Sequence, residues 1–407
     1  MNRVRLGRYI DQIASASQFW RRRENPLWIP HFNRVFAFSD WAVTELGSFE
    51  PDICLVHDSY ALSAGASISQ QTKCSLVFDA VEYPEHIGRS DSRASQITDM
   101  ESSSNLIRAY ENKIVSKTDV VLVGTRGVAQ WYANNTQAPK ANIVRNCLDF
   151  QELQATSSIR SDCGLSNEDR LVLYPNSVHP HCGIEETISA LNELPSNIHL
   201  AIMGNVPRAM ARSIKSHIRS TRLTSRVHIL PMRGPGDLIE YRSGADVAVI
   251  PLDPSIPNHQ TCLPNRFFEA IMSRLPVVVS NMPYVREVVE DHEIGVVAAN
   301  TTPLHIAKAI ADVIGNLDIY TNKAHRAAEI LNWDTEKSAF ISAFAPVLKG
   351  RENLKILCLA DKSLVTNSRV YRFTRALAEL GHNVKVMTWH LPAKEFRDDR
   401  ITYVAMK

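Results

Sequence analysis

Long apolar segments are missing from this chain of 407 residues. No apolar run approaches the roughly 18–20 residues that a membrane-spanning helix requires, and the N-terminus lacks a charged stretch followed by an apolar one. Secretion and integral membrane insertion are therefore not expected. With 44% hydrophobic and 22% charged residues, the chain has the composition of a globular protein with room for two domains.

Paired cysteines are absent as well. The seven cysteines stand at positions 54, 74, 147, 163, 182, 262 and 358, and no two of them form a CxxC motif. No histidine cluster has the spacing of a zinc site, so no metal site is predicted. Reduced thiols in a cytoplasmic protein are the simplest account. Glycine is scarce, at 16 of 407 residues against an average of about 7%, which leaves few candidates for phosphate loops.

A strong excess of one charge is also missing, because the formal net charge is only +2. Nucleic acid is therefore not expected as a partner. One segment, Phe19 to Arg23 with Trp28 nearby, combines arginines with aromatic residues, as interfacial membrane anchors do. It predicts peripheral contact of a cytoplasmic protein with a membrane. The alternative is a solvated basic helix end whose tryptophans pack inward.

Strand and helix patterns alternate along the chain, which indicates parallel βαβ units and doubly wound sheets. The first half has strand patterns at 51–58, 72–80, 118–124 and 141–149. The second half begins with a strand at 171–176, continues with one at 198–205, and has helices at 303–315 and 324–332. The polar, turn-rich stretch 156–169 between the halves reads as an interdomain linker.

The most informative segment is LPNRFFEAIMSRLPVVVSN, residues 263–281. The apolar period predicts a helix over 265–275, with Pro264 in its first turn and Pro276 ending it before a buried strand. Asn265 and Glu269 are four residues apart and share a face near the helix start. Free N–H groups there suit phosphate, and the carboxylate suits sugar hydroxyls. The alternative is an ordinary surface helix with an Arg266–Glu269 ion pair.

This segment resembles the donor-binding core of GT-B glycosyltransferases, especially the glycogen-synthase-like retaining group (family 4), in which a PN(K/R)-x-FE helix precedes a short buried strand. Residues 226–252 upstream and 281–297 downstream follow the same order of elements. The resemblance implies an α/β fold with two Rossmann-like doubly wound domains facing each other across a cleft. It also implies that Glu269 holds the ribose of a nucleotide sugar.

The C-terminal part of the chain is out of place in this scheme. Residues 354–360, 369–380 and 384–388 read strand, helix, strand, with Gly381 as a C-cap and a further strand at 401–406, and this pattern resembles the opening unit of a GT-B enzyme. We therefore expect a circular-permutation-like order, in which strand 354–360 pairs beside strand 53–56. The alternative is that this sequence is one segment of a tandem glycosyltransferase chain, in which the C-terminal part begins the next unit.

The expected domains follow from this order. They are an N-terminal Rossmann-like acceptor-side domain at 1–155, a nucleotide-sugar-binding domain at 170–335, a crossing helix and link at 336–353, and a βαβ unit at 354–407 that completes the first domain.

By resemblance, the donor's phosphates lie at the turn PNSVHPHCGIEE, residues 175–186. Gly183 fits the helix start, but Asn176 and Ser177 replace typical glycines, and Cys182 replaces the usual basic residue. Arg266 is then the one cation at a position where the family binds the phosphates, and His179 or His181 could supply a further hydrogen-bond donor. Thr261 replaces the family's first glutamate, within an NHxxxLPN variant of the motif. The remaining donor-binding candidates lie at strand ends and at the start of the tail helix: Gly204, Asn205, Met232, Asn367, Ser368 and Arg369.

The first domain supplies the predicted catalytic residues. VHDSYAL, residues 56–62, resembles the family's HxHD segment and places His57 and Asp58 at the cleft. FDAVEYPE, residues 78–85, resembles its DAHE segment and gives Asp79 and Glu82, either of which could orient the acceptor. Val81 replaces the histidine that is usual there. His57 could equally be a satisfied core histidine, and Arg145 and Asn146 could line the cleft.

The predicted function is a retaining, metal-independent glycosyltransferase that uses a nucleotide sugar and no further cofactor. The acceptor implied by the resemblance is a glycan or lipid-linked saccharide. The chain has no DxD metal motif. A catalytically silent GT-B partner or scaffold is the alternative, motivated by Cys182, Val81 and the displaced opening unit. A carboxylate-pair hydrolase and a nucleotide-sugar epimerase are minor alternatives.

Overall fold

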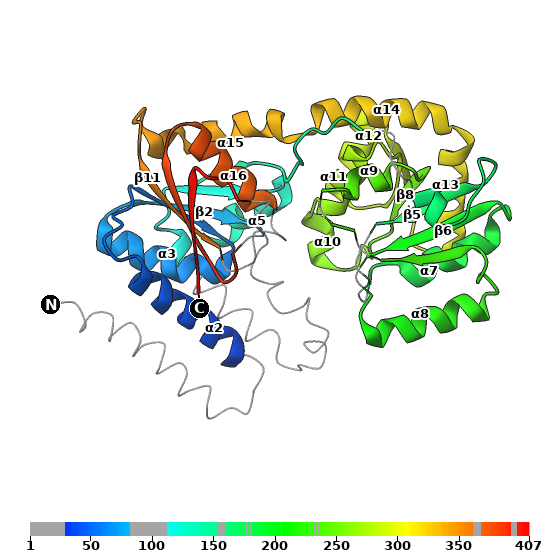
Figure 1. Ribbon diagram of the computed structural model, residues 1–407, viewed down its shortest axis with the longest axis horizontal. Coiled ribbons are helices and arrows are strands. Elements are labelled where there is room, and N and C mark those ends of the chain that lie inside the picture. Colours follow the sequence, from blue (N-terminus) through cyan, green and yellow to red (C-terminus); the bar gives the residue numbers. More distant parts are fainter. Residues whose placement is uncertain are drawn as a thin grey trace.

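The computed structural model describes residues 29–81, 112–153, 159–175, 178, 181–204, 206–231, 233–234, 236–360, 368–391 and 397–406. They form two bodies side by side, each built on a parallel sheet (Figure 1). The first sheet has seven strands in the order β13-β12-β11-β1-β2-β3-β4, and the second has six in the order β10-β9-β8-β5-β6-β7. The expected α/β class with two doubly wound sheets is confirmed.

The first sheet joins the two ends of the described chain. Its central strands β1 (Ile53–His57) and β11 (Lys355–Ala360) pair in parallel, with Ile53 opposite Ile356. The strand pairing predicted for the tail is thus present, and Figure 1 shows the late strands beside the early ones. The other strands are β2 (Ser75–Ala80), β3 (Val120–Val123), β4 (Ala141–Ile143), β12 (Asn383–Thr388) and β13 (Ile401–Ala405).

Apolar residues explain why this arrangement holds. β1 and β11 are buried along almost their whole length, as expected of central parallel strands covered on both faces. One face packs against α15 (Trp333–Leu348) and α16 (Ser368–Glu379), where Phe340 and Phe373 stack with centroids 4.2 Å apart. The other face packs against α2 (Ile29–Glu45), α3 (Ser59–Thr72) and α5 (Arg126–Asn135). Removal of β11 would leave β1 paired only with β2 and would expose its other edge.

The second sheet consists of β5 (Arg170–Tyr174), β6 (Ile198–Met203), β7 (Val227–Leu230), β8 (Val247–Ile250), β9 (Val277–Ser280) and β10 (Gly295–Ala298). Its helices are α6 (Ile159–Asp162), α7 (Ile184–Ala190), the 3-10 turn η3 (Leu191–Glu193), α8 (Arg208–Ser220), α9 (Leu238–Arg242), α10 (Pro257–Thr261), α11 (Asn265–Met272), α12 (Pro283–His292), α13 (Pro303–Gly315) and α14 (Leu317–Ile330). α14 and α15 lead back to the first body along one side of the molecule (Figure 1).

The bounds of several helices differ from the sequence prediction, for example those of α11 and α14. α11 ends at Met272 rather than at residue 275, because Arg274 adopts a left-handed φ of 60°. The amide of Leu275 then bonds to Ala270 O and that of Arg274 to Ile271 O, which is a Schellman ending that needs no proline. α14 begins at Leu317, earlier than the predicted residue 324.

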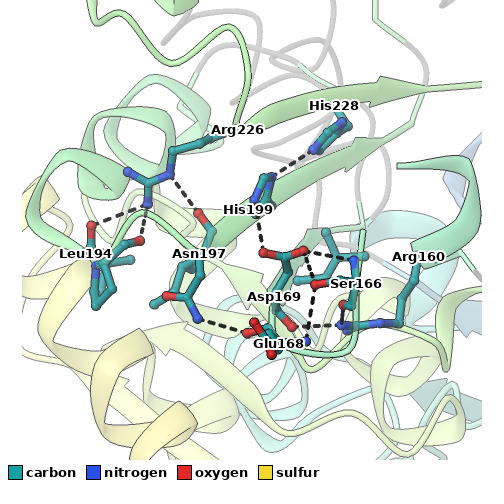
Figure 2. Close-up of polar contacts among 12 residues, drawn as sticks. Arg160, Ser166, Glu168, Asp169, Leu194, Asn197, His199, Arg226 and His228 are labelled. Carbon is teal, nitrogen blue, oxygen red and sulfur yellow. Dashed lines mark hydrogen bonds and ion pairs between the residues drawn. The ribbon is translucent and has the colours of Figure 1, made fainter. Parts of the chain in front are cut away.

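A polar network holds the amino ends of the strands in the second sheet (Figure 2). Arg226 donates to the carbonyl oxygens of Ile198, Leu191 and Pro195, so it closes the turn between η3 and β6. His199 and His228 lie on neighbouring strands with Nδ1 and Nε2 3.1 Å apart, and the other ring nitrogen of His199 is 3.8 Å from Asp169. This network lies at the opposite end of the sheet from the carboxyl ends of the strands.

Candidate functional site

The carboxyl ends of the two sheets face each other, and side chains at these ends are bonded across the two bodies. Thr125, just after β3, donates from Oγ1 to the carbonyl oxygen of Thr261 at 2.6 Å. Asn146, after β4, donates from Nδ2 to Oδ1 of Asn265 at 2.5 Å. In open α/β sheets ligands bind outside the carboxyl ends of the strands. The candidate site therefore lies where the start of α11 meets the first body.

Glu269 has a partner that the sequence did not reveal. Arg242, the last residue of α9, donates from Nη1 to Oε2 of Glu269 at 2.5 Å, and the Arg242 side chain is only 2% exposed. No Arg266–Glu269 ion pair is present. Arg242 thus holds one oxygen of the Glu269 carboxylate, and the Glu269 side chain remains 25% exposed to solvent. Only the packing of α9 against α11 brings these residues together.

Arg242 also reaches the first turn after β5. Its Nη2 is 3.5 Å from the carbonyl oxygen of Pro175, and its buried Nε has no hydrogen-bond partner among the residues that the structure describes. Buried polar groups are usually satisfied, so an orphaned guanidinium nitrogen in this position is an energetic cost. Arg242 therefore has unused hydrogen-bonding capacity directly behind the predicted ribose site.

Arg266 is a half-buried cation that forms no ion pair with any residue the structure describes. Among the described residues its guanidinium makes neither a hydrogen bond nor an ion pair, and burial lowers its pKa, an effect that nearby Tyr174 and Cys262 oppose. Desolvation of a charge without an ion-pair partner is unfavourable, so the surroundings of Arg266 favour an anion. Glu269 lies on the same helix face, which places the carboxylate and the cation side by side.

The turn before α7 is narrow and depends on Gly183. This residue has a φ of +71°, and a Cβ added there would lie 2.1 Å from the carbonyl oxygen of Pro251. Tyr174 donates its hydroxyl to the carbonyl oxygen of Cys182 at 3.0 Å. His181 lies 3.2 Å from Asp253 through Nδ1. The backbone is therefore held against β8, whereas the Cys182 side chain, only 1% exposed, faces the core.

Four predicted donor or acceptor residues, Glu82, Asn205, Met232 and Asn367, lie outside the described residues. The same holds for Asn176, Ser177 and His179, and for the aromatic-arginine segment near Trp20. Gly204 is described: it follows β6 at the carboxyl edge of the sheet and is half-buried. The carboxyl edge of the sheet is where ligands bind in open α/β folds, so Gly204 stays a predicted nucleotide-site residue.

In the first body, His57 and Asp79 form a buried pair. His57 Nδ1 lies 2.6 Å from Asp79 Oδ2, and Arg369 of α16 donates to both oxygens of Asp79 at 2.8–3.0 Å. Burial acts to raise the pKa of Asp79, but Arg369 and His57 outweigh it and hold this pKa at about 2. Asp79 is fully buried.

This geometry corrects two predictions. Asp79 has both oxygens occupied and no exposed surface, so it cannot orient an acceptor and instead positions His57 and Arg369. Arg369 stands at the start of the tail helix, which was expected to face the phosphates, but its guanidinium donates to Asp79 and to the carbonyl oxygen of Val144 at 2.6 Å and is not available to a phosphate. His57 is itself 2% exposed, which agrees with the alternative of a satisfied core histidine.

Asp58 has a strained backbone, with a φ of 68° and a ψ of 157°, and its Oδ1 accepts a hydrogen bond from the amide of Ser59 at 2.7 Å. It therefore caps α3 at the carboxyl end of β1. Outliers of this kind concentrate at functional sites. Val81, at the end of β2, is 37% exposed and presents an apolar side chain where the family's histidine was expected.

Three arginines of α16 anchor the segment between the two bodies. Arg369 binds Val144 O, Arg372 donates to Oδ1 of Asn146, and Arg375 pairs with Asp149. Asn146 thereby links Arg372 of the tail to Asn265 of the second body. Arg145, predicted to line the cleft, instead pairs with Glu336 of α15 at 2.6 Å.

In the part of the chain that the structure describes, no helix is sufficiently long and apolar to cross a membrane. The same residues include no group of three or more His, Cys, Asp or Glu side chains arranged to hold a metal ion.

Comparison with known proteins identifies the second body. Residues 156–329 match the family model of glycosyl transferases group 1. D-inositol 3-phosphate glycosyltransferase of Xylanimonas cellulosilytica is 23% identical over 261 residues, which cover 59% of this chain and 60% of that relative. The match thus spans less than two thirds of the relative's length.

The fold is shared with solved GT-B glycosyltransferases. Sucrose-phosphate synthase from Thermosynechococcus elongatus superposes with a TM-score of 0.67 at 16% identity, over 81% of this chain and 83% of that one. HepE from Anabaena, solved with UDP-glucose, gives a TM-score of 0.59 at 17% identity, over 77% and 81% of the two chains. The GT-B architecture expected from the sequence is confirmed.

Proposed function

Because residues 156–329 form a glycosyl transferases group 1 domain on a GT-B fold, we propose that the protein is a retaining glycosyltransferase that uses a nucleotide-sugar donor. The observation that carries the proposal is the pairing of Arg242 with Glu269, beside the unpaired cation of Arg266. A half-open carboxylate suits the ribose hydroxyls, and a desolvated cation suits the diphosphate. UDP-glucose bound to the structural relative HepE is a ligand of this class.

The proposed reaction needs little covalent chemistry from the protein. The bond between the anomeric carbon and the diphosphate oxygen breaks, and an acceptor oxygen bonds to that carbon on the same face. The acceptor proton passes to the departing diphosphate. Negative charge develops on the diphosphate, so fixed cations and N–H groups dominate catalysis. Arg266 and the amides at the Gly183 turn supply them, and no metal is required in this proposal.

The acceptor we propose is a glycan or a lipid-linked saccharide, which follows from the resemblance to family 4. Asp58 and the chain at the end of β2 lie on the acceptor side, at the carboxyl edge of the first sheet. Glu82 remains a proposed acceptor-orienting residue. The residues that we propose bind the donor are Glu269, Asn265, Arg266, Gly183, Gly204, Asn205, Met232 and Asn367.

The first test is thermal unfolding of the full chain with UDP, GDP and ADP and their glucose conjugates. A ligand that binds only the folded state stabilises it by about 2.7 kcal/mol at a hundredfold excess over its dissociation constant. We expect one nucleotide to raise the unfolding temperature of the wild type but not of Arg266→Gln. Retention of the shift in excess EDTA is the matching test of metal independence, and its loss would contradict that part of the proposal.

A catalytically silent partner protein is the second candidate, favoured by two observations. Val81 puts an apolar group in place of a histidine, and the thiol of Cys182 is turned into the core where a basic side chain was expected. This candidate predicts nucleotide binding without turnover. Release of UDP, GDP or ADP from the selected sugar nucleotide, with or without an added saccharide, would exclude it.

A further inference from the structure

One part of the second body carries charge of a single sign. Residues 194–236 contain no aspartate or glutamate and include seven lysines and arginines, although the whole chain has a net charge of only +2. Two of the seven are used internally, because Arg226 binds backbone carbonyls and Arg233 pairs with Asp162 at 2.7 Å. The other five lie on α8 and directly after it: Arg208, Arg212, Lys215, Arg219 and Arg222.

The inner face of α8 is fully engaged with the protein. Ile214 and Ile218 are buried in the core, and Met210 packs against it. Ser213 donates to Oε1 of Glu185 at 3.1 Å, and His217 lies 2.8 Å from the hydroxyl of Ser189. The helix therefore cannot insert its apolar side into a lipid bilayer. Its outer face alone is available to a partner.

That outer face is a stripe of unpaired cations. Arg208, Arg212, Lys215 and Arg219 follow one another at intervals of four, three and four residues, so they share one side of the helix over about 17 Å. All four residues are exposed, and none forms an ion pair within the described ranges. We call these four residues the α8 stripe.

We propose that the α8 stripe docks the protein on an anionic membrane surface through lipid headgroups. Clustered basic side chains near such a surface contribute favourable binding that falls off within a Debye length. The stripe is straight, and Figure 1 shows α8 on the outer edge of the second body, on the side remote from α14 and α15. The stripe contains no aromatic residue on which a nucleic-acid base could stack, which favours a planar anionic surface over single-stranded nucleic acid.

This docking mode is electrostatic and independent of the proposed transferase reaction. It predicts binding to vesicles of phosphatidylcholine with about 30 mol% phosphatidylglycerol, no binding to phosphatidylcholine alone, and release by about 0.5 M salt. The stripe variant R208Q/R212Q/K215Q/R219Q should bind about 600-fold more weakly, since each of the four cations near the surface contributes about fivefold.

The matched control is K117Q/K140Q/K308Q/R326Q. These four residues are exposed, lie outside the 194–236 segment and make no ion pair among the described residues, and the substitutions change the net charge equally. We expect the control to keep wild-type vesicle affinity within about threefold. Circular dichroism of both variants checks that the fold is intact.

Three results would overturn the proposal. One is absence of wild-type binding to the anionic vesicles, and another is an equal loss in the control, which would indicate a net-charge effect. The third is loss of binding to a single-stranded oligonucleotide in the stripe variant while vesicle binding is unchanged. That result would assign the stripe to nucleic acid. Vesicle co-sedimentation uses no sugar nucleotide. A negative result in this assay would therefore overturn membrane docking and leave the donor-binding proposal unaffected.

Discussion

Arg242 and Glu269 are 27 residues apart in the chain, yet Nη1 of the arginine lies 2.5 Å from Oε2 of the glutamate. The arginine is buried and the glutamate is one-quarter exposed. The pair therefore has two roles: it neutralises a charge inside the second body and it fixes the carboxylate that we propose binds the donor ribose. Those roles can be separated by substitution.

Glu269→Ala should lower both stability and donor affinity, because it leaves the Arg242 guanidinium buried without its counter-charge. We expect a loss of about 2 kcal/mol in the free energy of unfolding, reduced from the value for fully buried pairs by the exposure of Glu269. The double variant R242M/E269A should recover most of that stability and still fail to bind the donor. Urea unfolding and donor-induced melting shifts measure the two effects. Recovery of donor binding in the double variant would contradict the ribose role.

Asp79 should make the protein sensitive to acid. Its pKa is about 2 in the folded protein against an ordinary 3.8, so the unfolded chain binds a proton more readily as the pH falls. The stabilisation is complete above pH 3.8 and is lost as the pH falls towards 2; it amounts to roughly 2 kcal/mol.

Asp79→Asn should remove this dependence and lower stability at neutral pH, because Arg369 would keep only a neutral partner. Urea unfolding between pH 2 and 6 compares the variant with the wild type. An unchanged acid slope in the variant would show that other carboxylates govern the transition.

The sequence predicted the architecture better than the site. Alternating apolar strands and helices fixed the fold class, because burial of a parallel strand requires a continuous apolar run such as ICLVH of β1 or VVVS of β9. The pairing of β11 with β1 was predictable because each βαβ unit has a recognisable order. Arg242 was not predictable, since no local spacing relates α9 to α11. Asp79 was misassigned because a motif gives the position of a carboxylate and not what surrounds it.

Replacement of Gly183 should be more destabilising than replacement of Gly164, another glycine with a left-handed φ. Gly164 has a similar φ of +66°, but a Cβ added there would meet nothing within 4 Å, whereas at Gly183 it would meet Pro251 O at 2.1 Å. Gly164→Ala should therefore cost about 1–2 kcal/mol of unfolding free energy. Gly183→Ala should cost clearly more and also weaken nucleotide binding, because the turn must move away from β8. Equal losses in chemical denaturation would show that the turn adapts without strain.

The histidine pair in Figure 2 predicts a second pH dependence, nearer neutrality. Burial lowers the pKa of both His199 and His228, and His199 lowers that of His228 further, while Asp169 opposes the shift at His199. The folded protein therefore binds fewer protons than the unfolded chain just below pH 6.5. Stability should be fully present above that pH and decline as the pH falls through it.

Urea unfolding at pH 7.5 and 5.5 measures this decline. The double variant H199N/H228N should show a smaller difference between the two conditions than the wild type. A wild-type slope in the double variant would assign the effect to other groups.

The hydrogen bonds of Asn146 indicate that this residue couples the two bodies. Its amide accepts a hydrogen bond from Arg372 and donates one to Asn265, so a single side chain connects the tail helix to the first residue of α11. Asn146→Asp would retain the acceptor for Arg372 but lose the donor to Asn265, whereas Asn146→Ala loses both. If the contact positions α11 for catalysis, both variants should lower kcat by about tenfold and weaken donor binding less, because Asn265 is only one of several proposed donor-binding residues and most of the others lie in the second body. Asn146→Ala should in addition destabilise the protein by about 1–3 kcal/mol, since the buried Arg372 loses its partner.

Steady-state kinetics with the donor selected by melting gives kcat, and calorimetry gives the affinity. A loss confined to stability, with kcat unchanged, would reduce Asn146 to a structural link.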